Sequence, residues 1–216
     1  MNNIIESFEK INSNIRRLSL KQKINIVAVS KTFSLEHIKP LIEHGHEHYG
    51  ENRVQEAVTK WSELKSNNSK LKLHLIGKLQ TNKARDAIRL FDYIHSVDSQ
   101  KLADILSKHQ TNLDKRLKYF IQVNIGNEIQ KSGIHVNEVE SFYNYCVNNA
   151  RLDILGLMVI PPNDNDTKKY FKSLSELNKS LALPELSMGM SSDYIDAIKY
   201  GATFVRIGSS IFGSRS

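Results

Sequence analysis

The stretch INIVAVSK, residues 24–31, reads as a strand buried on both faces, and it ends on a lysine. Seven more short runs of strand character follow it, separated by segments of helical periodicity. These runs are HEHYGE (46–51), LKLHLIG (71–77), YIHSV (93–97), KYFIQVN (118–124), LDILGLMVI (152–160), ELSMG (185–189) and TFVRIG (203–208). Strands that alternate with amphipathic helices are typical of parallel βα units. Eight such units predict a closed (β/α)8 barrel, a TIM barrel of the α/β class, as a single domain over residues 1–216.

An open, doubly wound sheet is the alternative fold. It would usually carry the pattern G-x-G-x-x-G after its first strand, and VSKTFS (29–34) has no glycine. The segment 1–22 has helical spacing and is expected to form an additional helix that packs on the barrel. It lacks the apolar centre of an export signal.

Composition and charge narrow the class of protein. The 30 Lys and Arg against 23 Asp and Glu give a formal charge of +7, which favours anionic ligands, but the chain has no long basic block. A nucleic-acid-binding function is therefore only weakly indicated. No apolar stretch approaches the roughly 20 residues of a membrane span, and Cys146 is the only cysteine. We expect a soluble, cytoplasmic protein without disulfides.

Reactive groups in such barrels lie at the carboxyl ends of the strands. The candidates at these ends are Lys31, Asn52, Met158, Ser191, Arg206, Gly208 and Ser209. The loops after the seventh and eighth strands often bind phosphate, and GMSSD (189–193) and RIGSS (206–210) place small residues and hydroxyls there. Gly208 would let the backbone approach an anion, and Ser191 would cap a helix whose amides favour negative charge. An ordinary glycine turn with a serine cap remains the alternative.

Lys31 is the candidate for covalent chemistry. Most lysines are solvated surface charges, but burial lowers a lysine pKa and supplies the free amine that a Schiff base requires. An amine next to a phosphate cup matches the needs of pyridoxal 5'-phosphate. An arginine at the pyridine nitrogen, here Arg206, would stay protonated and make the cofactor a poor electron sink. The alternatives are a structural salt bridge for Arg206 and a phosphosugar enzyme in which Lys31 only binds an anion.

The motifs resemble those of the YggS/PROSC family of pyridoxal-phosphate homeostasis proteins from about residue 24 to the end of the chain. They are VAVSKT (27–32), YGENRVQE (49–56), HLIGKLQTNK (74–83), IHSVDS (94–99), QVNIGNEIQKSGI (122–134), GLMVIPP (156–162), LSMGMSSD (186–193) and VRIGSSIFG (205–213). The resemblance implies a fold-type III barrel similar to the N-terminal domain of alanine racemase. Two departures, Arg53 where an aromatic is frequent and IGNE (125–128) where serine and glycine are more usual, affect loop contacts.

The resemblance also implies a role for each candidate residue. The family's Schiff-base lysine, which carries the cofactor as an internal aldimine, falls on Lys31, and its arginine beside the pyridine nitrogen falls on Arg206. Phosphate contacts fall on Ser191, Gly208 and Ser209. Asn52 and Met158 match positions that line the cofactor face.

Two functions of different classes follow from this resemblance. The first is a binding protein, without catalytic residues, that stores, buffers or delivers pyridoxal phosphate, with pyridoxal-phosphate-dependent apoenzymes as candidate recipients. The second is a weak amino-acid racemase. Racemases of this type add a C-terminal β-domain that supplies a tyrosine across a dimer interface, whereas this sequence ends at Ser216 and offers only Lys31 as acid or base. We therefore expect a monomeric, non-catalytic carrier.

Several local features carry further expectations. His44, His46 and His48 suggest a metal, but Gly45 interrupts the helix and alternation along a strand leaves two ligands on one face, so no metal site is predicted. Gly45 and Gly201 are expected to end helices with positive φ, and Ser34 and Ser191 to begin them. Pro40 predicts a helix that is kinked or begins late.

Overall fold

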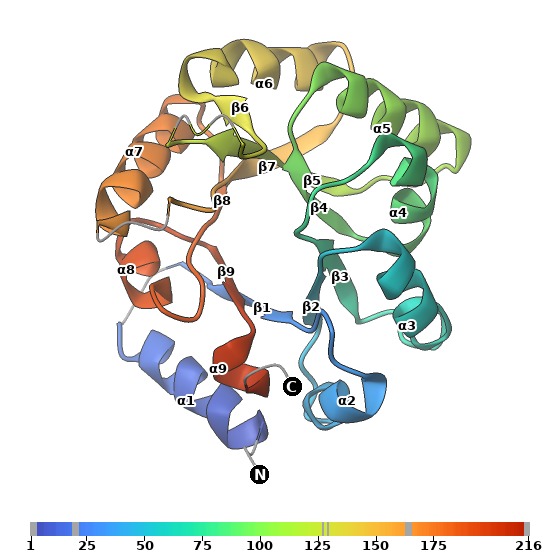
Figure 1. Ribbon diagram of the computed structural model, residues 1–216, viewed down its shortest axis with the longest axis vertical. Helices are drawn as coiled ribbons and strands as arrows, with labels where there is room; N and C mark the ends of the chain where they lie inside the picture. The colour runs from blue at the N-terminus through green and yellow to red at the C-terminus, as the bar shows by residue number, and fades with distance from the viewer. Residues whose placement is uncertain (1–3, 19–21, 127, 129, 163–165, 214–216) are drawn as a thin grey trace.

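The computed structural model describes residues 4–18, 22–126, 128, 130–162 and 166–213, in which parallel strands close into a barrel ringed by helices (Figure 1). Within these residues the strands are β1 (Asn25–Val29), β2 (His48–Glu51), β3 (Lys72–Leu75), β4 (Tyr93–Val97), β5 (Lys118–Asn124), β6 (Ile134–His135), β7 (Asp153–Met158), β8 (Glu185–Ser187) and β9 (Phe204–Ile207). They pair in the order β4-β3-β2-β1-β9-β8-β7-β5-β6, and a β4–β5 pairing closes the ring. The predicted barrel is confirmed, and the short β6 is an addition at the edge of β5.

The helices form the outer layer. They are α1 (Ile4–Arg16), α2 (Leu35–Glu43), α3 (Val54–Asn67), α4 (Ala84–Leu90), α5 (Gln100–Asn112), α6 (Val139–Asn148), α7 (Thr167–Ser180), α8 (Tyr194–Lys199) and α9 (Ser209–Phe212), with 3-10 turns η1 (Thr81–Lys83) and η2 (Val136–Glu138). Large side chains such as Trp61, Leu41 and Phe171 are fully buried between helices and strands. This layer fixes the strand ends, and with them the loops that carry the candidate residues.

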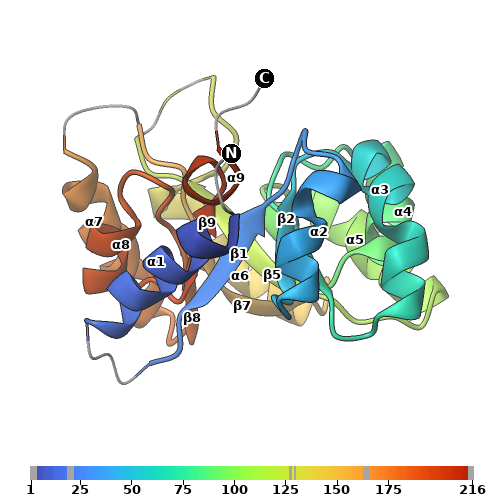
Figure 2. The same ribbon diagram turned by 90° about the horizontal axis from the view of Figure 1, so that it is seen from below.

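Helix α1 packs on the outside of the barrel, where α2 and α9 are its neighbours (Figures 1 and 2). Ile4, Phe8 and Ile11 form its buried face, and Asn14 Nδ2 donates to Tyr194 Oη at 3.2 Å. Residues 1–3 and 19–21 of the predicted segment 1–22 lie outside the described residues. None of the described helices has the length and apolar content that a membrane span requires.

Most of the local predictions are confirmed, and one is wrong. Ser34 caps α2 by accepting from His37 N, and Gly45 and Gly201 have φ of 91° and 98°. Helix α2 begins at Leu35 and contains Pro40, which excludes the late start and leaves the kink as a prediction. The Ser34 cap and the complete burial of neighbouring apolar side chains on the same helix offset the one hydrogen bond that a proline removes.

Ser191 does not begin a helix, in contrast to the prediction. Helix α8 begins at Tyr194, and the residue before it, Asp193, accepts from Met190 N through Oδ1 at 2.6 Å. The carboxylate closes the turn that a serine was expected to close. Ser191 is therefore left in the loop between β8 and α8.

Candidate functional site

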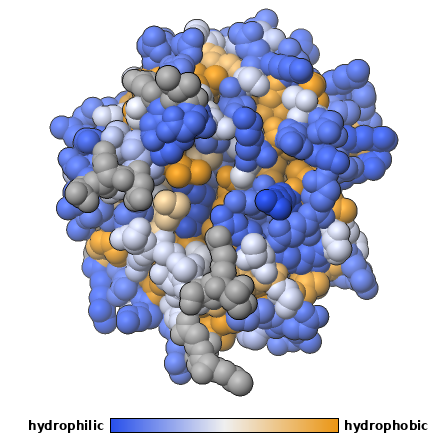
Figure 3. Space-filling view, viewed as in Figure 1, coloured by the Kyte–Doolittle hydropathy of each residue, from blue (hydrophilic) through white to orange (hydrophobic). Residues whose placement is uncertain are grey.

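A cavity of about 770 Å³ opens at the carboxyl ends of the strands and brings most of the predicted residues together. Its size is ordinary for a small-molecule site, about 300–1,000 Å³. Of the seven candidates, six line it: Lys31, Asn52, Ser191, Arg206, Gly208 and Ser209. Figure 3 looks onto this end of the barrel, whose surface is predominantly hydrophilic.

The backbone on both sides of Lys31 is anchored to the next βα unit. Ser30 Oγ donates to Glu51 Oε1 at 2.8 Å, and Lys60 Nζ donates to the Ser30 carbonyl at 2.9 Å. On the other side, Thr32 N donates to Glu56 Oε1 at 2.7 Å. Thr32 has a φ of 71°, a conformation that costs a non-glycine residue about 1–3 kcal/mol and persists only where its surroundings enforce it. These contacts fix the direction in which the Lys31 side chain leaves the barrel rim.

Arg206 is buried, with 4% of its surface exposed, and lines the floor of the cavity. Its Nη1 donates to Ser187 Oγ and its Nη2 to the Val159 carbonyl, both at 2.7 Å. Burial lowers the pKa of Arg206 to about 10, and Asp193 acts in the opposite direction. The guanidinium therefore keeps its charge at neutral pH.

The loops after β8 and β9 meet at the cavity, as the phosphate-cup hypothesis requires. Ser210 N donates to Ser191 Oγ at 3.4 Å, which joins the two loops. A Cβ added to Gly208 would lie 3.2 Å from the Val29 carbonyl, so this loop also approaches the end of β1 closely. The serine loops thus lie beside the strand that leads to Lys31.

The structure does not bring Met158 to the cavity. Its side chain is fully buried inside the barrel, in a cluster with Val27, Phe120 and Phe204. The reason is its place at the end of β7, where the side chain points inward below the level of the loops. Met158 supports the interior beneath the site instead of lining it.

Sequence reasoning missed several residues that line the cavity, and Gln122 and Phe33 are two of them. Gln122 stands in the apolar run KYFIQVN, where a lone polar side chain near a strand end is a signal for an inward-facing site residue. Phe33 follows the Lys31 turn, and its ring stacks on His37 at 4.8 Å between centroids. It provides an apolar wall of the cavity.

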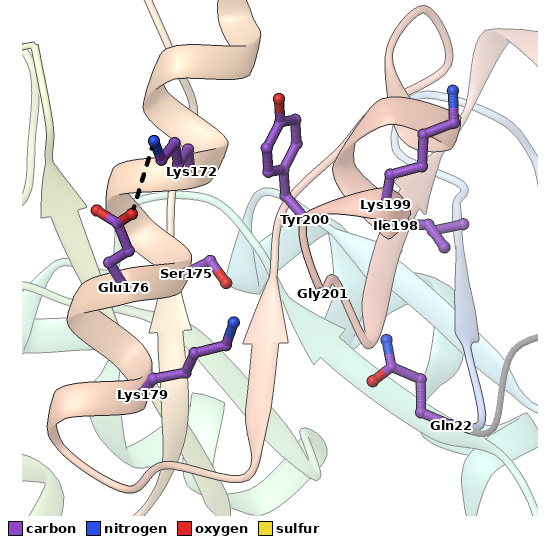
Figure 4. Close-up of a pocket in the computed structure, with 9 residues that line it drawn as sticks. All are labelled: Gln22, Lys172, Ser175, Glu176, Lys179, Ile198, Lys199, Tyr200 and Gly201. Carbon is purple, nitrogen blue, oxygen red and sulfur yellow. Dashed lines mark ion pairs between the residues drawn. The ribbon is translucent and has the colours of Figure 1, made fainter.

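A second cavity, of about 590 Å³, lies in the helical layer between α7 and α8 (Figure 4). Lys172, Lys179 and Lys199 surround it, and Lys172 pairs with Glu176 at 4.0 Å. Its lysines are exposed helix residues, and no strand delivers a side chain to it. The cavity at the strand ends is therefore the candidate site.

The histidines of residues 44–48 have partners other than a metal. His44 Nε2 lies 3.0 Å from Glu9 Oε1, and His46 Nε2 lies 2.9 Å from the His48 carbonyl. His48 Nδ1 contacts His74 Nε2. Across the described residues no group of three or more His, Cys, Asp or Glu side chains is placed to hold a metal ion.

The fold and the lysine at the end of its first strand define a barrel of the alanine racemase N-terminal class. A family model described as "Alanine racemase, N-terminal domain" matches residues 7–216. Alanine racemase of Clostridium difficile has the same fold, with a TM-score of 0.75 at 17% identity over 100% of this chain and 57% of that one.

Curated relatives narrow the class. A pyridoxal phosphate homeostasis protein of Aquifex aeolicus is 40% identical over 88% of this chain and 86% of its own length. The protein of the same name from Escherichia coli K12 is 32% identical over 100% and 98%. PipY of Synechococcus elongatus, solved with PLP bound, superposes with a TM-score of 0.87 at 35% identity over 98% of this chain and 100% of that one. The chain belongs to the family of pyridoxal phosphate homeostasis proteins.

Proposed function

We propose that this protein binds pyridoxal 5'-phosphate covalently at Lys31 and stores, buffers or delivers it in the cell. The observation that carries the proposal is the meeting of Lys31, Arg206 and the two serine loops in one cavity. The PLP-bound PipY and the homeostasis proteins among the relatives support it.

The donor set fits the cofactor. When bound, pyridoxal phosphate supplies an aldehyde that condenses with the Lys31 amine with loss of one water. Ser191, Gly208 and Ser209 would hold the phosphate, because their loops offer hydroxyls and a backbone position without a side chain. Arg206 would donate to the ring nitrogen and oppose its protonation. Asn52 would contact the cofactor face from the end of β2.

The cavity offers little for turnover. Among its described lining residues the titratable side chains are Lys31, Lys78 and Arg206, and none is a carboxylic acid, a histidine or a tyrosine. Racemisation by two bases needs a proton donor on each face of the substrate. Lys78 is exposed and Arg206 is already bonded to Ser187 and Val159. A carrier is favoured over a weak amino-acid racemase.

The test is an absorption spectrum of the purified protein with added pyridoxal phosphate, followed by borohydride reduction and peptide mass mapping. We expect a yellow protein whose reduced adduct maps to Lys31. Lys31→Ala is expected to abolish the adduct. Lys78→Ala, which removes the other amine of the same cavity, is the matched control and is expected to retain it.

A colourless protein without an adduct at Lys31 would leave only an anion-binding barrel. Turnover of alanine that disappears in Lys31→Ala would establish the racemase instead. Transfer is tested separately, by mixing the loaded protein with an apoenzyme that depends on pyridoxal phosphate. Faster reactivation than an equal amount of free cofactor gives in the presence of a phosphatase supports delivery, and equal or slower reactivation restricts the role to storage.

We also propose that the protein acts as a monomer in the cytoplasm. A reducing compartment suits its single thiol, because Cys146 is buried and burial raises its pKa to about 12, so it is unreactive. Sedimentation at micromolar concentration tests the monomer, and cell fractionation tests the location.

A further inference from the structure

A column of hydrogen-bonded polar groups runs inside the barrel beneath the cavity. His48 Nδ1 lies 2.9 Å from His74 Nε2, His74 Nδ1 lies 2.9 Å from His95 Nε2, and His95 Nδ1 lies 2.9 Å from Ser187 Oγ. Ser187 Oγ in turn accepts from Arg206. Barrel interiors are dominated by branched apolar residues, so this set is unusual. We call His48, His74, His95 and Ser187 the histidine column.

Arg206 determines the direction of every hydrogen bond in the column. A guanidinium can only donate, so Ser187 Oγ must be the acceptor at that end. Among the described residues His95 Nδ1 is the one other partner of Ser187 Oγ, and a buried hydroxyl proton without an acceptor is costly. Ser187 therefore donates to His95 Nδ1, which places the ring proton of His95 on Nε2. The same argument applied to His74 and then to His48 places their protons on Nε2 as well. All three imidazoles share one neutral tautomer.

Burial keeps the three rings neutral. It lowers the pKa of His74 and His95 well below the ordinary value, and Arg206 lowers that of His95 further. Burial, with Lys23 and Lys72, lowers the pKa of His48 to about 4.

Aromatic neighbours hold the rings in place. His74 stacks on Tyr93 at 4.2 Å and 8°, and His95 stacks on Phe120 at 4.4 Å and 22°. The column is therefore a rigid row of oriented dipoles with an acceptor facing Arg206.

The column matters because Arg206 is a buried charge bonded to neutral groups. Both of its hydrogen bonds go to neutral oxygens, and among the described residues no carboxylate lies within ion-pair distance of it, since Asp193 acts on it from further away. An isolated buried charge is costly unless dipoles and hydrogen bonds solvate it. A carboxylate partner would solvate the guanidinium but would also cancel its field in the cavity. Neutral acceptors solvate it and leave the field intact.

We propose that the histidine column positions Arg206. The column holds the guanidinium through a neutral acceptor, and its three imidazoles are fixed in one tautomer. The charge of Arg206 then faces the ligand without a directly paired carboxylate. The identity of that ligand rests on the proposed function. The tautomer lock, by which we mean the single neutral tautomer of the three histidines, does not depend on the proposed function, because it follows from the protein's own hydrogen bonds. The column residues touch no ligand; they act through Arg206.

The first experiment needs no ligand. Long-range ¹H–¹⁵N spectra of the histidine rings, recorded on the cofactor-free protein at pH 7, report the tautomer of each imidazole. We expect His48, His74 and His95 as neutral Nε2–H forms. A protonated ring or an Nδ1–H form at any of the three would overturn the lock. Arg206→Met, which removes the donor, is expected to produce mixed tautomers, and an unchanged pattern would show that Arg206 is not the cause.

The second experiment measures pyridoxal phosphate affinity and the pH profile of the bound chromophore. Ser187→Ala and His95→Phe break the column next to Arg206, and the second keeps a ring on Phe120. Ser187→Ala removes a hydrogen bond to the charged guanidinium and is expected to weaken binding about 10-fold or more. His95→Phe removes the hydrogen-bond partner of Ser187 Oγ and is expected to weaken binding in the same direction. Ser175→Ala removes another buried serine, beside the cavity of Figure 4, and is expected to change neither affinity nor profile.

The outcomes separate the two proposals. If the wild-type protein shows the expected tautomers but binds no pyridoxal phosphate, the proposed function fails and the lock stands. If binding and the pH profile are unchanged in Ser187→Ala and His95→Phe, positioning fails and the proposed function stands. A variant that does not fold is replaced by His74→Phe, which breaks the column one step further from Arg206 and is expected to have a smaller effect of the same sign.

Discussion

Lys60 Nζ lies 2.8 Å from Glu51 Oε1, and the two side chains are 9% and 0% exposed. Trp61 Nε1 and Ser30 Oγ donate to the same carboxylate oxygen. Because Lys60 also donates to the Ser30 carbonyl, the buried pair holds the residue that precedes Lys31. Hydrogen bonds therefore connect the core between β2 and α3 to the backbone next to Lys31.

Neutralising Glu51 is expected to be strongly destabilising. Glu51→Gln removes the nearer carboxylate of Lys60 and leaves Glu56 Oε1 at 3.6 Å, on a side chain that is 31% exposed, as the remaining one. The expected loss is therefore at most the about 3–5 kcal/mol that breaking a buried pair costs. Asp153→Asn is the matched control, because it breaks the Lys118–Asp153 pair, whose side chains are 48% and 49% exposed, for about 1 kcal/mol or less. Urea unfolding measures both, and similar losses in the two variants would contradict the role of the Glu51–Lys60 pair.

Removing the hydroxyl of Tyr49 is expected to stabilise the protein. Tyr49 is fully buried, and its hydroxyl has no hydrogen-bond partner among the described residues. Tyr49→Phe should raise the free energy of unfolding by about 1 kcal/mol, because an unsatisfied buried group is removed. Tyr119→Phe should lower it by about 0.5–1.5 kcal/mol, since the Tyr119 hydroxyl donates to Gln110 Oε1 at 2.9 Å. Thermal unfolding measures both variants. A change in the free energy of unfolding that has the same sign in both would contradict the prediction.

Introducing a side chain at position 77 is expected to distort the site, because it displaces the neighbouring backbone. A Cβ on Gly77 would lie 2.3 Å from the Asn52 carbonyl oxygen, so Gly77→Ala must displace the residue at the end of β2. We expect weaker pyridoxal phosphate binding, seen by titration, together with a stability loss of about 1–3 kcal/mol. Gly45→Ala meets no atom within 4 Å and is strained only by its φ of 91°. It should lose stability and keep its affinity.

Acid is expected to destabilise the protein through its buried histidines. Their pKa values are lowered on folding, those of His46 and His48 to about 4 and those of His74 and His95 well below the ordinary value. The unfolded chain therefore binds more protons below about pH 6.5, so stability falls as pH drops from 6.5 towards 4. Each histidine contributes up to about 1.4 kcal/mol per pH unit.

Unfolding free energies measured between pH 4.5 and 7.5 test this dependence. His95→Phe should reduce the slope by the share of one histidine. Equal slopes for the wild type and His95→Phe would contradict the neutral state of that ring.

The periodicity of the sequence predicts the barrel because each βα unit is a local pattern. The runs at 93–97 and 118–124 match β4 and β5 as observed, and the lysine at the end of the first run lies at the cavity. The carboxyl ends of all the strands in a parallel barrel lie at the same rim. Chain position alone therefore places Lys31, Asn52 and Arg206 at the same end of the barrel. Met158 was assigned to the cavity for the same reason, but residues at a strand end alternate between the interior and the helical layer, and its side chain lies below the rim.

The sequence alone could not place the histidine column. His74 and His95 lie in runs whose two faces are both buried, one in the barrel interior and one against the helices, so hydrophobic alternation does not tell these faces apart. Ser187 stands 92 residues from His95, and only the closed ring brings these two side chains within 2.9 Å. The sequence thus determined the strands, their order and the lysine at the rim, because these depend on neighbours along the chain. The contacts beneath Arg206 were decided by the closed tertiary structure, because they depend on which inward-facing side chains meet across the barrel.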